Sequence, residues 1–469
     1  MTARHGMLGE ELHLLRREGV AVWAVLALVA LVVAAALNGR ALMAVEARAA
    51  AAASAEANET RAAMAQQAGR GVASAREPGA AGYSVLAAPV ILPAAALGPL
   101  AIGQTDLLPG RYLVTARGVH NFLGNAGIDN PLRLALGNFD VAFVIVWLLP
   151  LAVIALTFNL VSGERERGVL AIAAAAGSDL SHFIAGKCRV RALVLLVTIW
   201  VALLLAALVG GVPIASGTGL VLWLVWATTA TLYGAFWFAL AVWVNTRGLA
   251  SDLNASVLTG AWLLFVVLAP ALTNLAATTV FAAPSRVALT TALREATEAA
   301  DKRAAGERDQ YFFDHPDMRG QDMDMGAYYR SVARSEREIS DAMLPLLAAF
   351  DTQAGRQQQL VGRLQYLSPG TLSYQVLTSL AGSDGTRHRQ LRAAALDFHA
   401  GWRDFFDRRL LSGASLDVSD YARMPRFIFK EPAVVDVLRR NLAPLAALLV
   451  IAVGLLAWAL RRLRRVSII

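Results

Sequence analysis

The sequence predicts a mainly α protein: a six-span helical membrane protein with a mostly helical extracytoplasmic domain built from two insertions. Three observations lead to this fold class. The 469 residues are 57% hydrophobic and have a mean hydropathy of +0.50, which is too apolar for a soluble protein of this size. Six apolar stretches have the length that a helix needs to cross the hydrocarbon core, about 20 residues. Two long segments between them are too rich in charge or proline to span a membrane.

The six predicted spans are distributed over the whole chain. They are Gly19–Leu37, Val141–Leu160, Ala192–Val212, Leu220–Val244, Ala255–Leu272 and Leu442–Leu460. The fifth is the least regular because Pro270 lies near its end, but proline is tolerated in a membrane helix whose neighbours satisfy the freed carbonyl. The first is not a cleavable signal peptide, since its apolar run is too long and Glu10 and Glu11 interrupt a basic N-terminal region.

Basic residues set the predicted orientation. Those beside the spans gather on one side of the predicted membrane: Arg16, Arg17, Arg165, Arg167, Lys187, Arg189, Arg191, Arg247, Arg461, Arg462, Arg464 and Arg465. The positive-inside rule makes that side cytoplasmic, so we expect N-in and C-in termini, with only Arg439 and Arg440 on the opposite side. The Ala- and Arg-rich composition suggests a bacterial inner (plasma) membrane. The net charge of +8 then reflects cytoplasmic rims that face the lipid bilayer, and no nucleic-acid partner is expected.

This topology divides the chain into alternating parts. They are a cytoplasmic interfacial helix (1–18), transmembrane helix 1 (19–38), a first extracytoplasmic segment (39–139), transmembrane helix 2 (140–161), a cytoplasmic loop (162–191), transmembrane helices 3–5 (192–273), a second extracytoplasmic segment (274–438), transmembrane helix 6 (439–460) and a cytoplasmic tail (461–469). Residues 41–70 are rich in alanine, which predicts that the first span continues outward as a helix. Residues 84–102 are apolar, but Pro89, Pro93 and Pro99 exclude a spanning helix and favour a packed loop or short strands.

The second outer segment carries helical patterns. We expect helices at Arg286–Glu307, Met325–Gln359, Leu372–Leu380 and Arg387–Leu411. Between positions 281 and 431, 20 basic side chains balance 20 acidic ones, so this segment is neutral. The two outer segments are expected to fold together into one domain, held by packing alone because Cys188 is the only cysteine.

Catalytic and metal-binding motifs are absent from the sequence. The nearest approach to a phosphate-binding loop, Ser181-xxxx-Gly186-Lys187, lacks the leading glycine and the closing Ser/Thr. His388 and His399 fall on roughly one face of a predicted helix, where a packed or solvated pair is more common than a metal site. Aromatic clusters near Tyr311 and Trp402 are more typical of core packing than of ligand contact. We therefore expect no enzyme and no cofactor bound by this chain.

The cytoplasmic loop is the most informative stretch. Glu164, Arg165, Glu166 and Arg167 alternate in charge and precede Gly168. Ser178 or Asp179 can cap a short helix, separate from the spans and parallel to the membrane, that ends near Lys187. Its apolar stripe consists of Leu180, Phe183 and Ile184. The pattern leaves two interpretations open, a docking surface for a soluble partner or a solvated interfacial helix that only anchors the topology.

The same residues carry a family resemblance. The loop resembles the signature between spans two and three of ABC-2-type permeases. The resemblance lies in Glu164 to Gly168, the apolar run that follows, Ser178-Asp179-Leu180 and Gly186-Lys187. One departure is Val169-Leu170, where many members have Thr-Leu. HGMLGEELHLLRREG before the first span resembles the family's elbow helix. Further stretches resemble a bacterial branch that has a large extracytoplasmic insertion of unknown function and is related to multicopper-enzyme-maturation permeases: LGPLAIGQTDLLPGRYLV, the run from 130 to 168, LQYLSPGTL and DYARMPRFIFKEP. The resemblance covers nearly the whole chain.

The resemblance implies a permease subunit of an ATP-binding-cassette transporter, with ATP and Mg bound by a separate ATPase subunit and a second permease completing a dimer. It implies that the coupling residues are Glu164, Arg165, Glu166, Arg167, Gly168, Asp179, Leu180, Phe183, Ile184 and Lys187. In this mechanism Glu164 and Glu166 brace the coupling helix through ion pairs with Lys187 or nearby arginines.

The alternative function is a mechanotransmission subunit, whose ATPase-driven motion acts on an extracytoplasmic partner without transport. The two functions differ in whether the spans enclose a polar path. The candidates for such a path are few: Asn159, Thr228, Thr229, Tyr233 and Asn274. An intramembrane enzyme would need ionisable residues inside the spans, and the six stretches contain none.

Overall fold

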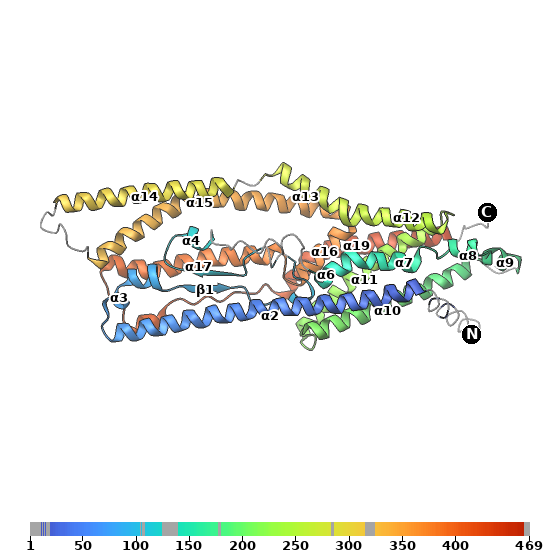
Figure 1. Cartoon of the computed structure of the whole chain (residues 1–469), viewed down its shortest axis with the longest axis horizontal. Helices are drawn as coiled ribbons and strands as arrows, with labels where there is room; N and C mark the ends of the chain where they lie inside the picture. The colour runs from blue at the N-terminus through green and yellow to red at the C-terminus, as the bar shows by residue number, and fades with distance from the viewer. Residues whose placement is uncertain are drawn as a thin grey trace.

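The computed structural model describes residues 11, 13, 15, 19–103, 105, 108–123, 139–176, 180–282, 286–314 and 324–463. Figure 1 shows an elongated molecule whose long helices run along its length. One half consists of closely packed apolar helices, here called the apolar bundle, and the other of polar helices with a two-stranded sheet, here called the polar domain. The protein is mainly α, as predicted, because β1 (Ala88–Ile91) and β2 (Arg111–Val114) are the only strands in the described ranges.

All six predicted apolar stretches coincide with helices that are long and apolar enough to cross a membrane, and only Ala192–Val212 extends past its helix, by two residues. These are α2 (Gly19–Gly69), the run α6 (Val141–Phe143), η3 (Val144–Leu148), α7 (Leu149–Thr157) and α8 (Ser162–Glu166), α10 (Leu180–Gly210), α11 (Gly217–Asn245), the run α12 (Ser251–Trp262), η4 (Leu263–Leu268) and α13 (Ala269–Val280), and α19 (Val434–Leu463).

A π-helical turn, η3, precedes Pro150 in the second of these helices. Proline has no N–H, so a carbonyl upstream of it loses its helical partner. The hydroxyl of Tyr233, on α11, donates a hydrogen bond of 2.9 Å to the carbonyl of Val146, four residues before Pro150. A side chain from a neighbouring helix therefore completes the backbone of α7.

The same arrangement recurs at Pro270, which follows the π-helical turn η4. In a π-helix the backbone N–H of a residue bonds to the carbonyl five positions upstream. For position 270 that carbonyl belongs to Phe265, and Pro270 has no N–H to donate to it. The hydroxyl of Ser368 donates to the Phe265 carbonyl. Pro270 is thus tolerated because a neighbour satisfies the carbonyl that it leaves free.

The centre of the apolar bundle is α11, whose Trp226, Tyr233 and Trp237 side chains are fully buried. A helix outside the six, α16 (Pro369–Leu380), also packs into this core through Leu372 and other apolar residues. The Trp226 indole N–H donates to the carbonyl of Leu377 on α16 at 3.1 Å. The sequence predicted this helix as part of the outer segment, and its apolar face explains why it lies against the bundle instead of in water.

The polar domain is organised around α17 (Gly385–Ser412). Its Trp402 and Phe406 are fully buried, so the predicted role of this aromatic cluster in core packing is confirmed. A Cβ on Gly82 would lie 2.5 Å from the Phe406 ring, so only glycine allows this approach. The two strands pair antiparallel beside α17, with Ala88 opposite Val114 at one end of the register.

The two segments that the sequence analysis placed outside the membrane, 39–139 and 274–438, pack together in the polar domain. Tyr83 from the first segment donates to Asp407 from the second at 2.5 Å, and Arg337 pairs with the other oxygen of Asp407 at 2.6 Å. A single hydrophobic core spans both segments. The remaining short helices of these segments are α3 (Ala73–Arg76), η1 (Ala80–Val85), η2 (Gly98–Leu100), α4 (Val119–Leu123), η6 (Gln365–Leu367) and α18 (Val418–Arg423).

Two long features connect the domain to the bundle. The helix α2 runs without interruption for 51 residues, about 75 Å at 1.5 Å per residue, and contributes Val32 to the bundle core and Met64 to the polar core. The helices α14 (Arg286–Asp314) and α15 (Met325–Leu364) form a long hairpin along one side of the molecule (Figure 1).

Candidate functional site: a charged hub beneath an exposed helix

The predicted coupling segment lies at the end of the molecule where α2 begins and α19 ends, and α9 (Val169–Ala175) is at its tip (Figure 1). Gly168 connects α8 to α9 in a left-handed conformation with φ of 74°. Side chains with a Cβ adopt this conformation only at a cost. The corner between α8 and α9 therefore depends on glycine at position 168.

Beneath this corner lies a cluster of four buried charges, which we call the charged hub: Glu11, Glu164, Lys187 and Arg191. Lys187 Nζ lies 2.6 Å from Glu164 Oε1 and 3.2 Å from Glu11 Oε2. Arg191 Nε lies 3.2 Å from Glu11 Oε1. None of the four side chains is more than 6% exposed. The hub joins the N-terminal segment, α8 and α10 into one unit.

The charged hub is balanced, with two carboxylates and two cations. Buried charges are stable in a protein only when they are paired and hydrogen-bonded. Arg191 meets this condition by also donating to the Leu156 carbonyl and to Asn159 Oδ1, at 3.1 Å for the latter. The predicted ion pair between Glu164 and Lys187 is confirmed, and its extension to Glu11 and Arg191 is an addition.

Arg165 and Glu166 of the same motif face a different element. Arg165 donates to the Leu249 carbonyl at 2.6 Å, and Glu166 accepts from the backbone N–H and hydroxyl of Ser251 at 2.7 and 2.8 Å. Glu166 thereby satisfies the first turn of α12, where a negative charge is favourable. Glu166 was expected to pair with Lys187 or a nearby arginine, and its carboxylate bonds to Ser251. Residues two apart in a helical turn project about 200° apart, so Glu164 faces Lys187 and Glu166 does not.

The predicted short coupling helix is also corrected. Residues 180–187 are the first two turns of α10, which continues to Gly210 without a break. Ile184 is 1% exposed, and Leu180 and Phe183 pack against the bundle core. The apolar stripe therefore faces the core of the bundle. Lys187 lies among buried partners and does not end a helix in water. Asp179 lies outside the described residues.

The exposed element is instead α9, which the sequence analysis missed. Ile172 is 70% exposed there, and Ala171, Ala175 and Ala176 are exposed beside it. The Arg167 side chain, 52% exposed, borders this surface while it pairs with Glu164. An available signal was Gly168, a helix-breaking residue just ahead of the apolar run VLAIAAA. We call Ile172 and these three alanines the α9 surface.

The interfacial helix predicted for 1–18 is described at only three positions, of which Glu11 and Leu15 are buried. Leu15 belongs to the core of the apolar bundle. Glu11 is therefore a functional candidate that sequence reasoning did not identify. Its signal was an acidic side chain shortly before the first apolar stretch.

Both histidines of the predicted pair contact backbone carbonyls. His399 Nε2 contacts the Arg117 carbonyl at 2.6 Å, and His388 Nδ1 contacts the Asp384 carbonyl at 3.2 Å. Burial lowers the pKa of both imidazoles. The expectation of a packed pair is confirmed, and the described part of the chain contains no group of three metal-ligating side chains. The side chains of Tyr311 and Phe312 lie outside the described part.

Three of the five polar side chains considered for a path between the apolar helices, Thr228, Thr229 and Tyr233, bond to backbone carbonyls. Thr228 and Thr229 donate to the carbonyls four residues upstream, at 2.7 and 2.8 Å. Tyr233 donates to Val146, as described above, and Asn159 accepts from Arg191. Asn274 is exposed. These contacts are typical of polar groups that satisfy helices in an apolar environment.

Comparison with known families gives one match. A family model described as a domain of unknown function, DUF3526, matches residues 286–430. The match covers the second segment of the polar domain together with α16 and assigns no activity to it. No curated protein matches the chain.

Proposed function

We propose that the protein is the membrane-spanning permease subunit of an ATP-binding-cassette transporter, which moves a substrate across the bacterial inner membrane using a separate ATPase subunit. One observation carries this proposal: an exposed helix, α9, stands directly on a buried charged hub that connects three parts of the apolar bundle. The six apolar helices and the resemblance of the Glu164–Gly168 motif to ABC-2-type permeases support it.

The geometry suggests how a push on α9 is transmitted. Glu164 connects α8 to Lys187 of α10, which pairs in turn with Glu11 of the N-terminal segment. Arg165 and Glu166 connect α8 to the start of α12. A displacement of the α8–α9 corner therefore acts on several bundle helices at once. ATP and Mg belong to the partner subunit, and a second permease, identical or a sister chain, completes the assembly.

The test is the capture of the ATPase by the full chain, purified from its native membrane in mild detergent. We expect a Walker-motif ATPase in the eluate. Ile172→Asp, on the α9 surface, should reduce its recovery at least tenfold. The matched control is Ile428→Asp, because Ile428 is 81% exposed but lies in the polar domain. Equal recovery with both variants, or no ATPase with the unmodified chain, refutes the proposal.

The mechanotransmission alternative is favoured by one feature, the unbroken helix α2. It has residues in both hydrophobic cores and so connects the bundle rigidly to the polar domain. In this case an extracytoplasmic protein should co-purify together with the ATPase. Reconstituted complexes should then hydrolyse ATP in response to that protein without moving a solute.

A further inference from the structure

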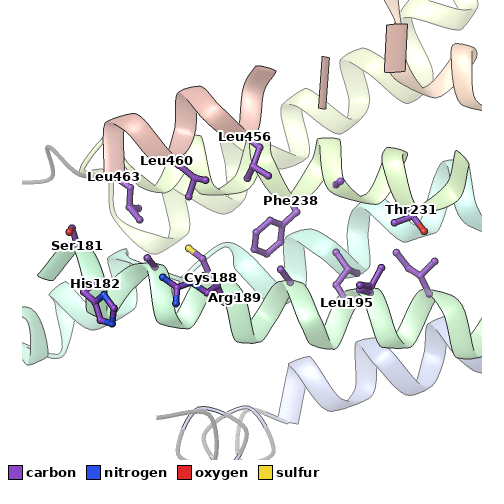
Figure 2. Close-up of a pocket in the computed structure, with 15 residues that line it drawn as sticks. Ser181, His182, Cys188, Arg189, Leu195, Thr231, Phe238, Leu456, Leu460 and Leu463 are labelled. Carbon is purple, nitrogen blue, oxygen red and sulfur yellow. The ribbon is translucent and has the colours of Figure 1, made fainter. Parts of the chain in front are cut away.

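A groove of about 550 Å³ lies between α10, α11 and α19, on a side of α10 away from the charged hub. Figure 2 shows Leu456, Leu460 and Leu463 of α19 facing Cys188 and Leu195 of α10 across the groove, with Phe238 of α11 between them. This side of the bundle is open, since Leu196 and Leu460 line the groove and are 41% and 39% exposed.

The helix α10 separates the groove from the hub. Its hub face carries Lys187 and Arg191, four residues apart. Its groove face carries Ser181, Ala185, Cys188 and Ala192 at spacings of three and four, which place side chains on one side of a helix. An occupant of the groove therefore touches the same helix that holds the charged hub.

The groove is apolar along its length and polar at one end. Thr231 lies in the wall, but its hydroxyl already donates to the Ala227 carbonyl at 2.9 Å. At the α9 end, the lining residues are Ser181, His182 and Arg189, with the Arg189 side chain exposed. A ligand that fits this pattern has a long apolar part and an anionic head.

We propose that the groove binds an anionic phospholipid of the surrounding bilayer, with an acyl chain along Leu195, Phe238 and Leu460 and the phosphate beside Arg189. This inference rests on the membrane insertion assumed in the proposed function. The positive charge around the groove favours an anionic lipid as its occupant. Exposed cations, including Arg247, Arg461 and Arg462, lie at the same end of the molecule and attract anionic headgroups.

The experiment measures lipid retained by the full chain with native mass spectrometry, after incubation with phosphatidylglycerol or phosphatidylcholine of identical acyl chains. We expect phosphatidylglycerol to be retained at least fivefold over phosphatidylcholine. Arg189→Gln should remove most of this preference, since one basic residue near the surface is worth about fivefold. Ala235→Trp should fill the groove and reduce retention of both lipids. Arg247→Gln is the control, because Arg247 lies at the same end, over Trp243, and does not line the groove.

A second measurement needs no substitution. Cys188 is the only cysteine of the chain and lines the groove, so phosphatidylglycerol should slow its reaction with N-ethylmaleimide at least fivefold more than phosphatidylcholine does. Equal retention and equal protection by the two lipids would overturn the inference. So would an Ala235→Trp variant that changes the oligomeric mass and leaves bound lipid unchanged, because the groove would then be a contact between copies.

These outcomes are separable from those of the proposed function. If the ATPase co-purifies but neither lipid is preferred, only the groove assignment fails. If phosphatidylglycerol is preferred and no ATPase co-purifies, the groove assignment stands and the transporter assignment fails.

Discussion

Lys187→Met is the most direct test of the charged hub. It removes one of the two cations of the hub and leaves Glu11, Glu164 and Arg191, three buried charges with a net charge of −1. At the observed 2.6 Å between Lys187 and Glu164, the Coulomb attraction at an effective dielectric constant of about 20 is about 6 kcal/mol. Part of this is offset by the desolvation that Lys187 no longer suffers, so we expect a loss of about 3–4 kcal/mol in the free energy of unfolding.

The double variant distinguishes pairing from packing. Glu164→Gln alone should cost about 2–3 kcal/mol, since it leaves an excess cation. In Glu164→Gln/Lys187→Met the hub is neutral again, because one acid and one cation remain. We therefore expect the double variant to lose about 3 kcal/mol, which is less than the sum of the single losses by about 2–4 kcal/mol.

The assay is reversible unfolding of the full chain in mixed detergent micelles, followed for the four members of the cycle. An exposed pair provides the control: Arg294 and Glu298 lie 2.8 Å apart, at nearly the same distance, but their side chains are 81% and 54% exposed. The coupling energy of that pair should be below about 0.5 kcal/mol. If the losses at Glu164 and Lys187 are simply additive, the two side chains do not stabilise each other and the hub is not an ion-pair network.

Three further predictions concern other parts of the molecule. Gly168→Ala should cost about 1 kcal/mol through its left-handed backbone alone, because no atom lies within 4 Å of the added methyl group, and pull-down should show weaker ATPase recovery. Trp402→Ala should destabilise the polar domain by about 3–5 kcal/mol, measured by chemical denaturation, whereas Trp23→Ala, 72% exposed, should not. Burial lowers the pKa of His388 and His399 in the folded state, so the unfolded chain binds more protons below about pH 6.5. The free energy of unfolding should therefore have its full value above that pH and decrease as the pH falls below it. His399→Gln should reduce this dependence of the free energy of unfolding on pH.

The features that the sequence predicted are those that depend on neighbouring residues. The apolar stretches are recognisable because about 20 consecutive side chains determine whether a helix suits the bilayer. The pairing of Glu164 with Lys187 was accessible because both belong to one short segment.

The unpredicted features depend on distant residues. The local sequence of Lys187 is typical of a surface residue. The side chain is buried because its charge is paired with Glu11 as well as with Glu164. Glu11 and Arg191, which also pair, are separated by 180 positions, and nothing in either local sequence indicates the other. For the same reason α16 was placed in the outer domain, since its contact with Trp226 involves a residue 151 positions away.

The hydrogen bonds that replace those lost at Pro150 and Pro270 have a mechanical consequence. At these points the helix is held by Tyr233 and Ser368, which belong to other elements, so its own backbone offers less resistance to bending there than elsewhere. A hydroxyl rotates and follows a moving carbonyl over a short distance, whereas an i to i−4 backbone bond must break. Both hinges lie partway along their helices, and the donors come from α11 and from the N-cap of α16. Bending of the second apolar helix therefore depends on the position of α11. Bending of the fifth depends on the position of the N-terminus of α16.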